Sequence, residues 1–274
     1  MRIAMVTEGF PLISETFIYR QANALRADVL ATRVDGNQIM SDFAGNTVSI
    51  SGGSDLRGNV LQKAGARVWR SLFGRPTPSW PTRVKVQAGR YFSERQPDVV
   101  LAHFLQNALR CGSTCQQHGV PLVIHANGMD VHRLPSNQRF RDALGPLFAQ
   151  AAAVVAVSHP MVCRLRQLGC PGEKISHICY GVPTAIFPVS KRAAEQPCRF
   201  LAVGRFVEKK APLCTLEAFL SCVEANPMVQ LELIGDGPQL PAARRYVRAQ
   251  GLDAQVTFLG EQSNSFVGER MRHA

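Results

Sequence analysis

The chain has 274 residues, of which 46% are hydrophobic and 19% charged, a balance that is typical of a globular protein and excludes a disordered one. Its length favours two domains, and no apolar run reaches the ~20 residues needed to cross a bilayer. The net charge at pH 7 is +11, and the basic residues that produce it are unevenly distributed.

Seven short apolar runs rich in β-branched residues alternate with helical patterns over the first two thirds of the chain. Several of these runs are apolar nearly throughout, as expected for parallel strands that helices cover on both faces. The alternation predicts an α/β fold with a doubly wound parallel sheet. The expected strands are residues 2–8, 28–33, 47–51, 98–104, 122–126, 153–158 and 174–180, and the expected helices are residues 15–26, 106–118, 137–150 and 160–168.

The segment from Arg57 to Arg95 holds nine Lys or Arg residues and one acidic residue, Glu94. Apolar residues recur in it at helical spacing, and basic residues follow another flank of the same helix. Such a helix suits an anionic membrane surface, and it suits equally well a core-facing helix with a solvated basic side. No nucleic-acid-binding motif accompanies the charge, so nucleic acid is not expected as a partner.

Residues 183–197 contain three prolines and a polar run, which predicts an interdomain linker. Residues 1–182 then form a first domain and residues 198–274 a second one. The second domain offers three strand candidates, and open parallel sheets usually have more. We therefore expect the second domain to be incomplete at residue 274. Its expected strands are residues 199–205, 229–235 and 255–260, and its expected helices are residues 212–224, 239–250 and 263–272.

Ligands of open α/β sheets bind beyond the carboxyl ends of the strands, so the residues that follow each strand are the site candidates. His125 and Asn127 alternate with Ala126 after the fifth expected strand, and they therefore project to the same side. With Asp130 they indicate a catalytic site, while capping of the next helix is the structural alternative. His103 lies at the carboxyl end of its own strand in the same way. A structural role fits this residue at least as well as a functional one.

The loop after the first strand contains Ser14, Glu15 and Thr16, an arrangement typical of a helix N-terminus. It contains no G-x-G-x-x-G fingerprint, and the chain has no Walker lysine motif. These absences argue against a plain dehydrogenase or NTPase.

The string VGRFVEKKAP places Gly204, Arg205 and Lys210 between a buried strand and the start of a helix. Cations beside the free N–H groups of a helix N-terminus form an anion site that suits a diphosphate. The next strand ends in IGDGP, where Gly235 and Gly237 let the backbone approach a ligand closely. A solvated turn is the alternative for each loop taken singly, and the two together on successive strands indicate a site.

The strings VGRFVEKKAP, ELIGDGP, VTFLGEQS, VAVSHPMVCRLRQLGCPGEKI and FPLISETFI together resemble family 4 glycosyltransferases, above all the branch associated with colanic-acid-type exopolysaccharide assembly. The resemblance covers nearly the whole chain. It implies two Rossmann-like domains of the GT-B type, a nucleotide-diphosphate sugar as donor substrate, no cofactor, no metal, and transfer with retention at the anomeric carbon. It also implies a polysaccharide or lipid-linked acceptor, and a cytoplasmic enzyme that can lie peripherally on the inner face of the membrane.

Residue by residue, the resemblance places the family's diphosphate-binding Arg and Lys on Arg205 and Lys210. It places the nucleobase-binding loop on Glu261 and Gln262, and the cleft loop of the first domain on the SETF turn, residues 14–17. Two departures stand out. Asn127 occupies the usual active-site histidine position, for which His125 is the nearest substitute, and the chain ends before the family's pair of glutamates, so that roughly 100 residues are expected to be missing.

Two alternatives to an active transferase stay open. A non-catalytic fragment of such an enzyme would bind a nucleotide or a partner protein without turnover. An epimerase-like enzyme on the same architecture is the other alternative, and the motif strings favour the transferase over it.

Overall fold

A computed structural model of the chain describes residues 1–11, 15–34, 43–50, 80–187 and 198–274. The chain forms two compact units, Met1–Gly181 (unit 1) and Val182–Ala274 (unit 2), which are described separately below. Ser14, most of the segment from Arg57 to Arg95, and most of the expected linker lie outside the described residues.

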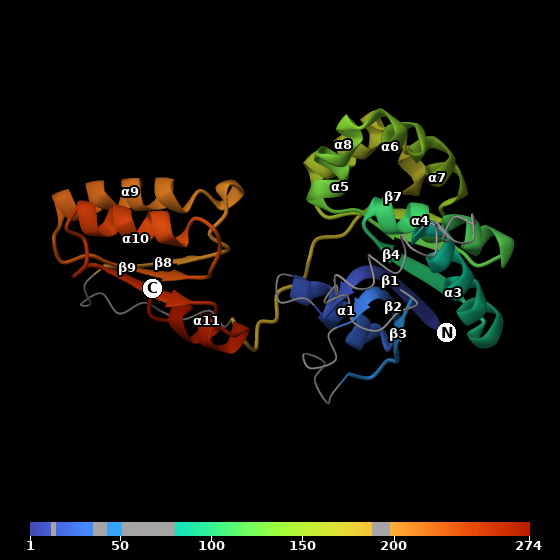
Figure 1. Ribbon diagram of the computed structural model, residues 1–274, viewed down its shortest axis with the longest axis horizontal. Helices are drawn as coiled ribbons and strands as arrows, with labels where there is room; N and C mark the ends of the chain where they lie inside the picture. Colours follow the sequence, from blue (N-terminus) through green and yellow to red (C-terminus); the bar gives the residue numbers. More distant parts are fainter. Residues whose placement is uncertain (12–14, 35–42, 51–79, 188–197) are drawn as a thin grey trace, which may run out of the picture. The chain divides into compact units, whose positions relative to one another are not determined.

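Unit 1 is built on a seven-stranded sheet in the order β3-β2-β1-β4-β5-β6-β7, and every neighbouring pair is parallel (Figure 1). The predicted α/β class and parallel sheet are thus confirmed. The strands are β1 (Ile3–Phe10), β2 (Asp28–Val34), β3 (Thr47–Ser49), β4 (Val99–His103), β5 (Leu122–His125), β6 (Ala153–Ala156) and β7 (Ile175–His177).

Alternate side chains of these strands enter two separate cores, because successive residues of a strand point to opposite faces. Helix α1 (Thr16–Leu25) covers the face of Met5, Val29 and Leu101. The other face, with Val6 and Ala102, packs against the remaining large helices of the unit. The other helical segments of unit 1 are α3 (Trp80–Arg95), α4 (Leu105–Gln117), α5 (Gly128–His132), η3 (Leu134–Ser136), α6 (Gln138–Asp142), α7 (Leu144–Gln150), α8 (His159–Gln167) and η4 (Gly172–Lys174).

The helix expected over residues 137–150 is divided into α6 and α7. Pro146 lies in the first turn of α7, where its missing N–H group is not needed, whereas inside a continuous helix it would remove a hydrogen bond. The strand expected over residues 174–180 is also shorter, because β7 ends at His177.

Unit 2 contains a parallel three-stranded sheet in the order β10-β9-β8 (Figure 1). Helices α9 and α10 pack together on one face over the buried Leu231 and Leu233. Glu232 points to the opposite face, where Arg270 of α11 donates a hydrogen bond to it from Nε at 2.7 Å. The elements are β8 (Arg199–Val203), η5 (Glu208–Lys210), α9 (Pro212–Ala225), β9 (Gln230–Ile234), α10 (Leu240–Ala249), β10 (Val256–Gly260) and α11 (Asn264–Met271).

No described helix in either unit combines the length and the apolar character that a membrane span requires.

Candidate functional site

Two histidines form the centre of the carboxyl edge of the sheet in unit 1. The register of β4 and β5 pairs His103 with His125, so the two side chains project from the same face. Their rings stack with centroids 4.8 Å apart and an interplanar angle of 27°. Phe17, from the first turn of α1, meets His103 edge-on at 5.8 Å between ring centroids.

Both imidazoles are buried, His103 fully and His125 to all but 4% of its surface. Burial and the neighbouring His125 lower the pKa of His103 to about 3. Burial also lowers the pKa of His125. Both ring nitrogens of His103 and Nδ1 of His125 have no hydrogen-bond partner among the described residues. The pair is therefore neutral at pH 7 and has hydrogen-bonding capacity to offer.

The carboxylate of Asp130, in the first turn of α5, joins two strand-to-helix junctions. Its Oδ1 accepts from the Asn127 N–H at 2.9 Å, and its Oδ2 accepts from the N–H of Leu105, the first residue of α4, at 2.7 Å. The side chain is fully buried, which raises its pKa to about 7. Because both oxygens are engaged with backbone groups, Asp130 holds the ends of β4 and β5 in place, as the capping alternative foresaw.

The residue after His103 is held in an unusual backbone conformation. Phe104 has φ 69° and ψ 141°, a region that residues other than glycine seldom adopt. Its N–H donates to the carbonyl oxygen of His125 at 2.9 Å, which links the ends of β4 and β5 a second time. Strain of this kind persists only where surrounding contacts enforce it, and such places are often functional.

A tyrosine that the sequence did not single out completes this cluster. Tyr180 lies three residues beyond β7, and its hydroxyl donates a short hydrogen bond to Oδ1 of Asn127. Its ring stacks on His125 at 5.4 Å between centroids, with an interplanar angle of 14°. Burial, with the charges of Asp130 and Glu15 adding to it, raises the pKa of Tyr180, so the hydroxyl stays a donor. Its position at the sheet's carboxyl edge was the available signal, but the strand expected over residues 174–180 included Tyr180.

The predicted cleft loop is described only in part. Glu15 is the N-terminal cap residue of α1, and Thr16 begins the helix, with its hydroxyl accepting from Arg20 at 3.2 Å. The neighbouring Phe17 lies against Tyr180, with ring centroids 4.4 Å apart. The structure thus brings the start of α1 to the same edge as His125 and Asn127.

In unit 2, the predicted cations follow β8 directly. Arg205 is exposed, and Lys210 is the last residue of η5. The methylene stem of Lys210 lies 3.8 Å from where a side chain on Gly204 would begin, so the lysine folds back over the end of β8. Ala211 then adopts a left-handed conformation with φ 46°, and α9 begins at Pro212. Within the described part of the chain, neither cation has a carboxylate at ion-pair distance.

The two predicted glycines bring neighbouring loops together. Gly235 has φ 138°, and a Cβ atom there would lie 2.0 Å from the carbonyl oxygen of Gly204. Gly237 has φ 151°, and its Cβ would lie 2.6 Å from the carbonyl oxygen of Phe206. Both glycines therefore approach the loop that carries Arg205 and Lys210, while their expected close approach to a ligand stays a prediction.

The last predicted pair follows β10 at the same edge of the sheet. Glu261 is exposed, and the side-chain amide of Gln262 donates to the carbonyl oxygen of Leu259 at 2.6 Å. All the predicted residues of unit 2 consequently lie at the carboxyl ends of its three parallel strands, which is where open α/β sheets bind ligands.

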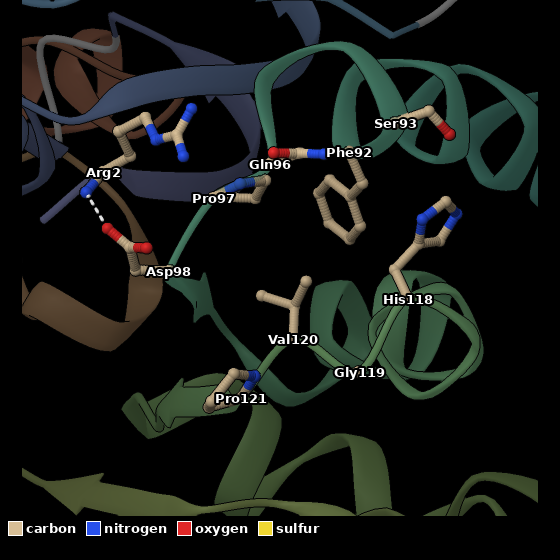
Figure 2. A pocket seen from close by; sticks show the side chains of 10 residues that line it. All are labelled: Arg2, Phe92, Ser93, Gln96, Pro97, Asp98, His118, Gly119, Val120 and Pro121. Carbon is tan, nitrogen blue, oxygen red and sulfur yellow. Dashed lines mark hydrogen bonds between the residues drawn. The ribbon is translucent and has the colours of Figure 1, made fainter.

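Unit 1 also has a pocket of about 460 Å³, but it lies at the opposite, amino edge of the sheet (Figure 2). Asp98 and Arg2 flank it, and the Arg2 N–H donates to Oδ2 of Asp98 at 2.5 Å. It contains none of the predicted site residues. The carboxyl edge, and not this pocket, is therefore the candidate site.

Comparison with known proteins shows the family to which the chain belongs. Residues 15–186, more than half of the chain, match the family model of Glycosyltransferase Family 4. The chain is 31% identical over 146 residues to the amylovoran biosynthesis glycosyltransferase AmsK of Erwinia amylovora, covering 51% of this chain and 35% of that protein. It is 25% identical over 207 residues to the lipopolysaccharide core biosynthesis glycosyltransferase LpsD of Rhizobium meliloti, covering 74% of this chain and 54% of that protein. The chain thus spans about a third to about a half of these relatives.

Among solved structures, the chain resembles HepE of Anabaena in complex with UDP and glucose, with a TM-score of 0.73, 14% identity, and coverage of 99% of this chain and 72% of that one. It also resembles the apo form of the lipopolysaccharide outer core galactosyltransferase WaaB, with a TM-score of 0.65, 15% identity, and coverage of 100% and 72%. At this level of identity the likeness shows the fold, which is the GT-B type.

Proposed function

Because the chain belongs to glycosyltransferase family 4, we propose that it moves a hexose-type sugar from a nucleotide-diphosphate sugar to a cell-surface polysaccharide or a lipid-linked acceptor. The names of the relatives support the acceptor class, since they are assigned to amylovoran and lipopolysaccharide core synthesis. The HepE structures, which contain UDP or UDP-glucose, support a nucleotide-sugar donor.

The observation that carries the proposal is the basic loop at the end of β8 in unit 2. Arg205 and Lys210 precede the N-terminus of α9, whose first N–H groups have no partner within the helix. As the bond between sugar and phosphate breaks, negative charge grows on the departing diphosphate. Cations fixed in this place stabilise the transition state more than the ground state, which lowers the barrier. Unit 2 is therefore the proposed donor-binding side, with Gly204, Gly235, Gly237, Glu261 and Gln262 around the nucleotide.

Unit 1 is the proposed acceptor side. His125 is neutral, and Asn127 is held at the same sheet edge, so both can exchange hydrogen bonds with sugar hydroxyl groups. Retention at the anomeric carbon and independence of metal ions belong to the proposal, on the strength of the family resemblance. In such a reaction the positive side chains of the donor side would serve the departing diphosphate.

A cytoplasmic location with peripheral attachment to the inner face of the membrane is the matching proposal for the acceptor class. A lipid-linked acceptor presents itself at a membrane surface, and the excess of basic residues between Arg57 and Arg95 suits anionic lipids.

Titration calorimetry with UDP and with GDP tests the donor site. We expect one of them to bind, and we expect the double substitution Arg205→Ala, Lys210→Ala to weaken that binding at least about 100-fold, since each lost charge-assisted contact is worth about 1.5–3 kcal/mol. The double substitution Arg245→Ala, Arg248→Ala removes the same charge from exposed positions of α10 and should leave the affinity unchanged. No heat with either nucleotide from a folded sample, or equal affinity of the first double variant, would contradict the proposal.

A further inference from the structure

Tyr180 reaches the candidate site from an unexpected part of the chain. It lies beyond β7, which β6 separates from β5 in the sheet. Its side chain nevertheless meets His125 and Asn127, both at the end of β5. It is also the last residue but one of unit 1. The side chain of Tyr180 thus attaches the segment that leaves unit 1 to the site.

The hydroxyl of Tyr180 helps to orient the amide of Asn127, together with the capping box of α5, in which the Asn127 side chain also accepts from the Asp130 N–H. Oδ1 of Asn127 accepts from this hydroxyl, and Nδ2 donates to the carbonyl oxygen of His125 at 3.1 Å. A flipped amide would place its oxygen against that carbonyl oxygen, two acceptors facing each other. The observed pair of bonds therefore selects one orientation, in which the second N–H of the amide is left for a ligand.

The ring of Tyr180 acts on a different neighbour. It lies nearly parallel to the imidazole of His125, whose ring also stacks on His103. Two rings cannot occupy the same face of an imidazole, so His125 is held between Tyr180 and His103. Phe17 packs against the ring of Tyr180 and limits its movement.

We propose that Tyr180 is a positioning residue with two separable actions: its hydroxyl fixes the amide of Asn127, and its ring fixes the imidazole of His125. The proposal rests on the proposed function in one respect, namely that Asn127 and His125 meet the sugar substrates. The geometric part of it can be measured without any substrate.

Nuclear magnetic resonance of the ¹⁵N-labelled chain separates the two actions. The side-chain amide of Asn127 is assigned by its disappearance in Asn127→Asp, and the ring nitrogens of His125 by their disappearance in His125→Gln. Tyr180→Phe keeps the ring and removes the hydroxyl, so we expect shifted and faster-exchanging Asn127 amide signals with the His125 signals in place. Tyr180→Leu removes both groups and should move both sets of signals. Tyr246→Phe, on α10 in unit 2, is the matched control and should move neither.

Turnover of UDP-glucose, with release of UDP as the measured product, tests the consequence for the proposed reaction. We expect Tyr180→Phe to lower kcat about 10- to 100-fold while the affinity for UDP stays as in the unchanged chain, because misplaced reacting groups reduce rate and the proposed diphosphate contacts belong to unit 2. If the unchanged chain does not turn over UDP-glucose, the proposed function fails for that donor, and the resonance measurements still decide the role of Tyr180. Asn127 signals that are identical in Tyr180→Phe and in the unchanged chain would overturn the inference.

Discussion

His103 combines full burial with a polar ring that has no hydrogen-bond partner in the described part of the chain. A buried polar atom without a partner destabilises a protein by about 1–3 kcal/mol. We therefore expect His103 to lower the stability of the native state, in which its flat ring stacks against His125.

We expect His103→Phe to raise the free energy of unfolding by about 1–3 kcal/mol at pH 7.5, since a ring of similar shape replaces the unsatisfied one. The difference in unfolding free energy between His103→Phe and the unchanged chain should grow below pH 6.5, by at most about 1.4 kcal/mol per pH unit. Unfolded His103 takes up a proton there, whereas the folded residue, with a pKa of about 3, does not, so the stability of the unchanged chain is lost as the pH falls.

Urea unfolding of both proteins at pH 7.5 and pH 5.5 measures this difference. Asp130, whose raised pKa gives the opposite trend, is present in both proteins and cancels in the comparison. His273→Phe is the control, because its exposed ring meets water in both states. A variant less stable than the unchanged chain at pH 5.5 would show that a hydrogen-bonded role of His103 outweighs its burial.

At the scale of elements, the sequence predicted strands better than the contacts that follow them. Apolar runs such as residues 122–126 identify parallel strands, because both faces of such a strand are buried. The three loops of unit 2 were predictable as well, because glycines and charged residues cluster at the ends of its strands. The bond from Tyr180 to Asn127 was not predictable, because it joins residues 53 positions apart whose proximity depends on the order of β5, β6 and β7.

Two glycines at strand ends allow a matched test of the contact between loops. Gly235 and Gly260 both have positive φ, and only at Gly235 would a Cβ atom strike backbone. We expect Gly260→Ala to lower the free energy of unfolding by about 1–2 kcal/mol, the usual result of a left-handed alanine. Gly235→Ala should lower it further and should also abolish binding of the diphosphate, UDP or GDP, that the unchanged chain binds, because the loop of Arg205 must move. Thermal unfolding and calorimetry measure the two effects, and equal losses in both variants would refute the contact.

At the scale of the whole molecule, the excess of positive charge favours association with an anionic lipid surface, which can be tested. The described end of the basic segment includes the exposed Lys85, while Arg90 is engaged with Glu94 at 2.7 Å. We expect the chain to sediment with vesicles of phosphatidylcholine and phosphatidylserine at 0.1 M salt and to dissociate at 0.5 M, because such attraction is screened.

The substitution Lys85→Glu should weaken that association about 30-fold, since one basic residue near the surface contributes about 1 kcal/mol and charge reversal doubles the change to about 2 kcal/mol. Arg248→Glu changes the charge equally on α10 and should have no comparable effect. Equal recovery with pure phosphatidylcholine vesicles, or equal weakening by both substitutions, would contradict attachment through the basic segment.

The left-handed alanine between η5 and α9 has a further consequence. A glycine at position 211 would reach φ 46° without strain, but it would also sample many other conformations before an anion arrived. With alanine, the free chain has fewer arrangements to give up in the proposed binding of a diphosphate by Arg205 and Lys210. We therefore expect a smaller loss of chain entropy on that binding than glycine at this position would give.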